Sequence, residues 1–413
     1  MGRRILVVTY FHPPFPGGGG ARWVALAKHL RRAGHEVGVI TTSAHGSLPE
    51  DDGEGTVRTA DMAASGGLRR LLRRPALPER GAPGGAGANA KPPPTLLTRT
   101  LVPDPHVVSW APLALAAARR AIRVSGGVDC LVTSGPPEST HLVGLALRRS
   151  VGAWMADFRD GWSYEPLRDP FPAAAQRRLD LSLERRVALR ADAVLGATEP
   201  IARDLAERLG ANAVHVPNGW DPDLEEQVAR AEPPPLEEGV VNLVHTGTMS
   251  GGWGRDPRPL FDALRQAGGR IRLVLAGRLD TEEERLIRAP GLEGVVKHVG
   301  SLGRFEAIAL QRRADALVLV TSRNASEATG KLFEYLASGR PVIALAEGNE
   351  AARIVRDTGA GVTVAPDDTQ AIAEVLRAAE RGELPYEPRG LDAYAYPAPA
   401  DAVAELMERV LAR

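Results

Sequence analysis

The sequence predicts an α/β protein built from two doubly wound parallel sheets, each in its own domain. Its length of 413 residues suggests two domains at roughly 150 residues each. Short apolar runs alternate with helical patterns in both halves of the chain, which is typical of βαβ units. A Pro-rich stretch, Pro233-Pro234-Pro235, separates the two alternating series. Ligands of open α/β sheets bind outside the carboxyl ends of the strands, so we expect a deep cleft there.

The first half opens with a βαβ unit. Ile5–Tyr10 predicts a buried strand, Arg22–Arg32 carries apolar residues at helical spacing, and Glu36–Thr42 predicts the next strand. Gly34 ends the helix between the two strands. The alternation continues with strands expected at Val128–Thr133, Ala153–Asp157 and Ala193–Ala197, and helices around 139–150, 173–190 and 200–209.

The alternation is interrupted between about residues 62 and 98. Leu68–Arg74 is short, basic and apolar, and Arg80–Pro94 is rich in Gly, Ala and Pro without a period that could bury a core. We interpret this segment as a mobile loop of the N-terminal domain. The basic turn Leu68–Arg74 is suited to contact anionic lipid head groups; the alternative is a solvated helix end beside a tolerated insertion.

The second half restarts the alternation after Pro217-Asn218-Gly219. We expect strands at Val240–His245, Ile271–Ala276, Val295–Val299, Ala316–Val320, Pro341–Leu345 and Gly361–Val364, with helices at 257–267, 281–289, 304–313, 330–338, 349–357 and 368–380. A last helix, Ala400–Leu411, is expected to pack back on the first domain. The predicted organisation is an N-terminal domain 1–217, a linker 218–238, a second domain 239–395 and a C-terminal helix 396–413.

Composition excludes several classes of protein. With 44% hydrophobic and 25% charged residues the chain is an ordinary globular sequence, and its 51 basic and 51 acidic residues argue against nucleic-acid binding through a broad basic surface. The single cysteine, Cys130, excludes an internal disulfide and Cys-based metal sites. No apolar run reaches the ~18–20 residues of a membrane span, and Ile5–Phe11 is too short for a signal peptide. We expect a cytoplasmic protein with no obligate protein partner, and leave peripheral contact with the inner membrane face open.

A run of glycines, Gly17–Gly20, lies between the first strand and its helix. Glycines at this position let the backbone approach a ligand closely, and the start of the helix favours an anion. The alternative is a flexible turn without a ligand. The spacing is not that of the dinucleotide fingerprint G-x-G-x-x-G.

A second candidate anion site lies where the loop after Ala316–Val320 enters a helix at Thr329-Gly330. Free amides and the Lys331 ammonium suit phosphate oxygens, and Glu334 projects from nearly the same helical face. A lysine for a diphosphate and a carboxylate for vicinal hydroxyls is the pair that a nucleotide sugar requires. The alternative is a common i,i+3 surface ion pair. The Walker pattern is missing, which argues against a P-loop ATPase.

The stretch GKLFEYLASGRPVIAL around Lys331 resembles the donor-binding helix of GT-B glycosyltransferases, specifically of glycosyltransferase family 4. The other segments that resemble family motifs, in order, are FHPPFPGGGGARWVALAKHLRRAGHEVGVITT, VTSGPPESTHLVGLALRR, WMADFRDGW, HVPNGWD, LVHTGTM and LVLAGR. Together they cover nearly all of the chain apart from about 62–98.

The resemblance implies the GT-B fold and a retaining, metal-independent transfer of a sugar, with no cofactor besides the donor substrate. The donor would be a UDP- or GDP-linked sugar, and the acceptor a small molecule or a lipid-linked saccharide. Two alternatives remain: a GT-B sugar-nucleotide 2-epimerase, and a catalytically silent nucleotide-sugar-binding subunit.

The resemblance also implies roles for residues of the second domain. Lys331 would contact the donor diphosphate, Arg255 would be a second cation for the leaving group, and Glu334 would bind the ribose hydroxyls. Glu327 precedes Glu334 by one residue fewer than in the widespread family signature, which leaves its role open. The remaining donor-side residues are expected to be Gly18, Gly19, Gly247, Arg278, Ala328, Thr329 and Gly330.

In the first domain, His141 would face the transferred sugar and complete a catalytic set with Arg255 and Lys331. The alternative is a histidine that only hydrogen-bonds the backbone at a helix start. The acceptor-side candidates are Asp157, Arg159 and Asp160, for which the alternative is an Arg–Asp network that fixes the loop.

Overall fold

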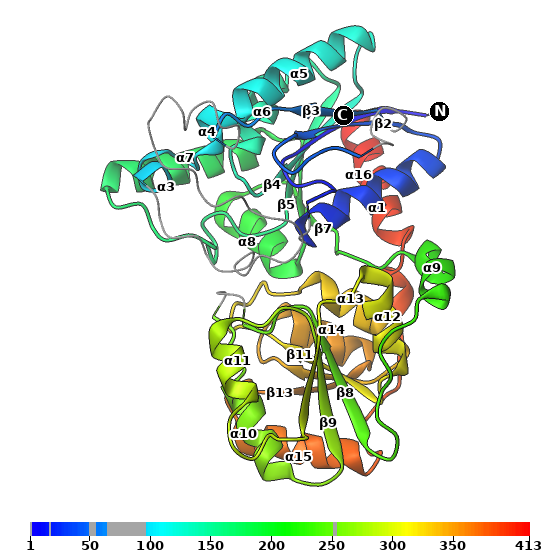
Figure 1. Cartoon of the computed structure of the whole chain (residues 1–413). Helices are drawn as coiled ribbons and strands as arrows, with labels where there is room; N and C mark the ends of the chain where they lie inside the picture. Colours follow the sequence, from blue (N-terminus) through cyan, green and yellow to red (C-terminus); the bar gives the residue numbers. More distant parts are fainter. Residues whose placement is uncertain (1, 16–17, 49–54, 64–95, 251–253) are drawn as a thin grey trace. The chain divides into compact units, whose positions relative to one another are not determined.

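The computed structural model describes residues 2–15, 18–48, 55–63, 96–250 and 254–413. These residues form two units, each with its own sheet (Figure 1). Unit one contains the described residues up to Asn218 together with Tyr396–Arg413, and unit two is Gly219–Ala395. Within the described ranges, no helix combines the length and the apolar character needed to cross a bilayer.

Unit one is built on a seven-stranded parallel sheet in the order β3-β2-β1-β4-β5-β6-β7. The central strand β1 is buried along nearly its whole length, as its continuous apolar run predicts. The strands are β1 Arg4–Thr9, β2 Glu36–Thr42, β3 Thr56–Thr59, β4 Cys130–Gly135, β5 Ala153–Phe158, β6 Ala193–Gly196 and β7 Ala213–His215.

Helices cover both faces of this sheet, and each face has its own hydrophobic core. One core joins the sheet to α1 and α16, and the other joins it to α5, α6, α7 and α8 (Figure 1). The helices are η1 Gly18–Gly20, α1 Ala21–Arg32, α3 Leu96–Thr100, α4 His106–Ser109, α5 Ala111–Val124, α6 Thr140–Leu147, α7 Ala174–Arg190, α8 Glu199–Leu209 and α16 Ala398–Leu411.

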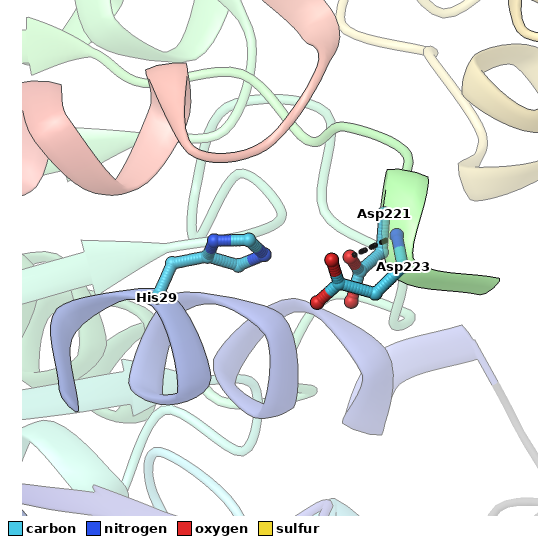
Figure 2. A group of neighbouring side chains, drawn as sticks. All are labelled: His29, Asp221 and Asp223. Atoms are coloured by element: carbon cyan, nitrogen blue, oxygen red, sulfur yellow. Dashed lines mark hydrogen bonds between the residues drawn. The ribbon is translucent and has the colours of Figure 1, made fainter. Parts of the chain in front are cut away.

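The C-terminal helix α16 packs on unit one. Its buried residues Val403 and Met407 belong to the same core as Trp23 of α1. Just before the helix, Tyr396 stacks on His29 of α1 with ring centroids 5.2 Å apart. Figure 2 shows His29 projecting from α1.

Helix α3 begins at Leu96, at the end of the segment predicted as a loop at about 62–98. Residues 64–95, including Leu68–Arg74, lie outside the described residues, and the interpretation as a mobile loop stays a prediction.

Unit two contains a six-stranded parallel sheet in the order β10-β9-β8-β11-β12-β13. The strands are β8 Val241–Thr246, β9 Ile271–Ala276, β10 Val296–Gly300, β11 Ala316–Val320, β12 Val342–Leu345 and β13 Gly361–Val364. The order reverses between β8 and β11, and this reversal marks the switch point where ligands of such sheets bind. The predicted fold class is confirmed in both units.

The helices of unit two alternate with these strands as predicted, apart from short segments near its ends. They are η2 Pro222–Leu224, α9 Glu225–Arg230, α10 Arg258–Ala267, α11 Thr281–Ile287, α12 Arg304–Arg313, α13 Gly330–Leu336, α14 Glu350–Thr358, α15 Thr369–Glu380 and η3 Leu391–Tyr394. Asp221 caps η2, because its carboxylate accepts a hydrogen bond of 3.1 Å from the backbone N–H of Asp223 (Figure 2).

Candidate donor site and acceptor-side residues

Lys331 lies in the first turn of α13, and its ammonium reaches the end of β8. The Nζ atom donates to the carbonyl oxygen of Thr248 at 2.9 Å and to Nε2 of His245 at 3.2 Å. His245 is 1% exposed, and its Nδ1 lies 2.8 Å from the carbonyl oxygen of Val318 on β11. Its Nε2 faces both the Lys331 Nζ and the carbonyl oxygen of Thr248, each at 3.2 Å. In the tautomer with the proton on Nδ1, which donates to the closer carbonyl of Val318, Nε2 accepts from the Lys331 ammonium.

Burial changes the protonation of both partners. It lowers the pKa of Lys331 to about 7, and the nearby Arg255 guanidinium lowers it further against the opposing effect of Glu327. Burial and the Lys331 charge also lower the pKa of His245 to about 3, so this histidine is neutral at physiological pH. Lys331 is therefore easily deprotonated, and an incoming anion would stabilise its charged form.

Glycines keep the surroundings of Lys331 open. Gly247 has φ +84°, and an ideal Cβ there would lie 3.2 Å from the Lys331 Nζ. Gly330, the first residue of α13, has no atom within 4 Å of its ideal Cβ position. Beside it, the buried Oγ1 of Thr329 has no hydrogen-bond partner among the described residues, and Ala328 is partly buried. The structure thus brings all three residues predicted at this helix start close to Lys331.

Arg255 and Glu327 form an ion pair in the same unit. The Arg255 Nε lies 2.6 Å from Oε1 of Glu327, and the two side chains are 11% and 10% exposed. The other carboxylate oxygen accepts from the Ser322 backbone N–H at 2.7 Å and from the Ser322 hydroxyl. Glu327 therefore fixes Arg255 to the loop after β11 and partly neutralises its charge.

Glu334 lies one turn after Lys331 and faces Arg304, whose Nη2 is 3.5 Å from its carboxylate. Burial raises the pKa of Glu334, while Arg304 opposes this effect. The carboxylate lines a small pocket together with Trp220 and Ile308. Arg278 follows the end of β9 and is partly buried.

In unit one, Asp157 is an internal hydrogen-bond acceptor at the end of β5. It is fully buried and accepts from Trp23 Nε1 at 2.7 Å, Ser134 Oγ at 2.8 Å and Arg22 Nη2 at 3.1 Å. The Arg22 side chain also donates to the carbonyl oxygens of Val216 and Pro217. Asp157 therefore belongs to an Arg–Asp network. Its arginine is Arg22, which was not among the candidates predicted from the sequence.

Arg159 holds two loops together. It donates to the carbonyl oxygens of Gly135 at 3.0 Å and Pro136 at 2.6 Å, and to that of Gly19 in the glycine run. Gly18 and Gly19 form η1 at the start of α1. Asp160 next to it is partly buried, and burial raises its pKa.

His141 lies inside unit one. It is 1% exposed, its Nδ1 is 3.0 Å from the Thr133 hydroxyl, and its ring stacks on Phe158 with centroids 4.6 Å apart. Burial lowers its pKa to about 3. An ideal Cβ on Gly135 would lie 2.7 Å from the His141 Nε2, so the glycine leaves room for this ring.

Two groups near the predicted sites were missed. His245 lies in the segment LVHTGTM, but nothing in the sequence indicated that it contacts Lys331. Glu138 lies between β4 and α6, where burial and the neighbouring Asp104 raise its pKa to about 8. Its only sequence signal is a lone carboxylate between Pro137 and Ser139.

Comparisons with known sequences identify two family profiles. The profile described as Glycosyltransferase Family 4 matches residues 16–224, and the profile described as Glycosyl transferases group 1 matches residues 243–380. No curated protein matches the chain.

Solved structures share the fold over nearly the whole length. Sucrose-phosphate synthase from Thermosynechococcus elongatus has 19% identity and a TM-score of 0.63, covering 99% of this chain and 100% of its own. Anabaena HepE in complex with UDP has 16% identity and a TM-score of 0.63, covering 98% and 100%. A putative UDP-N-acetylglucosamine 2-epimerase from Listeria monocytogenes has 11% identity and a TM-score of 0.55, covering 98% of this chain and 96% of its own. The two-sheet architecture is thus the GT-B fold.

Proposed function

Because the chain belongs to glycosyltransferase family 4, we propose that it transfers a sugar from a nucleoside diphosphate donor to an acceptor nucleophile. We further propose retention of anomeric configuration and no essential metal, as the resemblance implies. The observation that carries the proposal is the Lys331 site: a partly buried ammonium at a helix start, with Gly247 and Gly330 leaving space beside it. A diphosphate is the anion that this site suits.

The chemistry follows from where charge develops. The departing diphosphate gains negative charge in the transition state, and fixed positive groups stabilise it there more than in the ground state. Lys331 and Arg255 would supply these charges, with Glu327 holding Arg255 in place. The backbone of Ala328, Thr329 and Gly330 would add amide donors. The leaving phosphate would accept the acceptor proton, as is usually proposed for the family.

Glu334 would bind the ribose hydroxyls of the donor. Its carboxylate lies one turn from Lys331 and is 26% exposed, which suits a group that meets a ligand at the protein surface. Arg304, 3.5 Å away, would keep it ionised against burial. We expect a UDP- or GDP-linked donor, such as a hexose derivative.

The Listeria protein shares the fold of this chain, which keeps the epimerase alternative in view. The two matching family profiles are those of glycosyltransferases and favour sugar transfer. A cytoplasmic location and membrane contact through Leu68–Arg74 remain part of the proposal.

A thermal-shift screen of nucleoside diphosphates tests the donor site. A ligand at 100 times its Kd should stabilise the protein by about 2.7 kcal/mol. The Lys331→Ala variant should lose this shift for the best ligand and lose transfer by roughly 10²–10³ in rate. Lys297→Ala, which removes an exposed lysine of β10, is the matched control. Equal shifts and near-normal turnover in Lys331→Ala would contradict the assignment.

A further inference from the structure

A group of aromatic rings lies at the carboxyl ends of β1 and β2 in unit one, and none of these rings has been assigned a role so far. Ring centroids are 4.5 Å apart for Phe11 and Phe15, 4.8 Å for Phe15 and His45, and 4.3 Å for Tyr10 and His106. Phe11, Phe15, His45 and His106 are only partly buried. Phe15 belongs to neither hydrophobic core of the unit, so packing of the sheet does not explain it.

His106 is held by a buried carboxylate. Asp61, 2% exposed in its side chain, lies 3.1 Å from the His106 Nδ1 and accepts from the Tyr10 hydroxyl at 2.6 Å. Burial alone would raise the pKa of Asp61, but the hydrogen bonds from His106 and Tyr10 outweigh it and hold the pKa well below its usual range. The carboxylate is ionised and can only accept, so the imidazole proton lies on Nδ1.

The other ring nitrogen of His106 is then available to a ligand. The side chain is 27% exposed, and its Nε2 has no hydrogen-bond partner among the residues that the structure describes. In the tautomer that carries its proton on Nδ1, Nε2 presents a lone pair, which accepts a hydrogen bond from a hydroxyl. A buried charge that orients a partly exposed imidazole is a costly arrangement for a purely structural role.

Aromatic faces beside an oriented acceptor atom suit a sugar. The C–H faces of a pyranose pack on aromatic rings, while its hydroxyls need hydrogen-bond partners of fixed direction. The rings also adjoin residues that the sequence assigned to the site. Phe11 lies under the Arg159 guanidinium at 5.6 Å, and an ideal Cβ on Gly19 would be 3.7 Å from its ring.

We propose that Phe11, Phe15, His45 and His106 bind a sugar ring of the acceptor, which makes the acceptor a saccharide or glycoside. His106 accepts a hydrogen bond from an acceptor hydroxyl, and Asp61 is a positioning residue that fixes the imidazole. This inference rests on the proposed transferase function, and it names the class of acceptor.

The test uses the full chain and four methyl pyranosides as probes: those of glucose, galactose, mannose and N-acetylglucosamine. Saturation-transfer difference NMR should show binding of at least one of them to the wild type. Phe15→Ala and His106→Ala should each weaken that binding by roughly five- to tenfold. Asp61→Asn should weaken it as well, and in a transfer assay it should raise the acceptor KM more than it lowers kcat.

Controls separate this proposal from the donor site. Val124→Ala, which removes a side chain 79% exposed at the end of α5, should leave sugar binding unchanged. The thermal shift produced by UDP or GDP should be the same in all variants, and Phe15→Leu provides a second variant if Phe15→Ala unfolds. Absence of binding of all four sugars, or equal binding to wild type and variants, would overturn the subsite. If the wild type binds a sugar but neither UDP nor GDP, only the donor proposal would be refuted.

Discussion

The protonation of Lys331 gives the sharpest prediction about donor binding. Its pKa of about 7 lies far below the ordinary value of 10.5, because the ammonium is buried beside the neutral His245 and close to Arg255. A bound diphosphate would restore the charge, so binding at neutral pH should be accompanied by proton uptake. The direction is fixed: nucleotide affinity should fall as the pH rises above 7.

The magnitude follows from the protonated fraction. With a pKa of about 7, roughly half of Lys331 is charged at pH 7 and about 1% at pH 9. If only the charged form binds, the affinity falls about 50-fold over this interval, or about 2.3 kcal/mol. Proton uptake on binding should be about 0.5 at pH 7 and about 0.9 at pH 8.

Isothermal titration calorimetry of UDP or GDP, in buffers of different ionisation enthalpy, measures both quantities. Lys331→Arg is the matched control, because a guanidinium stays charged throughout this range. It should keep measurable affinity and lose most of the pH dependence, while the titration of the nucleotide itself contributes equally to both proteins. The same pH profile and the same proton uptake in wild type and Lys331→Arg would refute the argument.

Three further outcomes are expected. Gly330→Ala should leave the melting temperature unchanged or raised, since nothing lies near its ideal Cβ, yet it should weaken nucleotide binding in the thermal-shift assay; a large loss of stability would contradict this. Asp157→Ala leaves the buried Arg22 without its charge partner and should lower the free energy of unfolding in urea by about 3–5 kcal/mol. The control Arg203→Ala, in an exposed ion pair, should lower it by at most about 1 kcal/mol, and similar losses for both variants would disprove the network. Glu138 has a pKa of about 8 in the folded protein and an ordinary pKa when unfolded, so its contribution to stability is lost as the pH rises from about 5 to 8. Glu138→Gln should therefore flatten the fall of the melting temperature over this pH range. An unchanged slope would contradict the raised pKa.

The order of strands and helices was largely predictable from sequence, since continuous apolar runs mark buried parallel strands. The strands that were missed, β3 and β7, have only four and three residues and are partly exposed. Their hydrophobic signal is too short to stand out from a loop. Helix α5 was missed for another reason, because alanines make up much of its buried face and contrast little with their surroundings.

The helix carrying Lys331 and Glu334 was also predictable, because a glycine, a lysine and a glutamate within one turn of a helix start are local features. The partners of these residues were not. His245 and Lys331 are 86 positions apart, and Arg255 and Glu327 are 72 apart. Each pair forms only because the strand order of the sheet brings different strand ends and loops together.

Protonation likewise depended on the tertiary structure. A lysine in a sequence has an ordinary pKa, and only its depth and the charges around it lower that value. The sequence therefore determined which chemical groups stand at the strand ends. The folded chain decided which of them are buried and which are paired with each other, because desolvation and Coulomb energies depend on distances between residues that lie far apart along the chain.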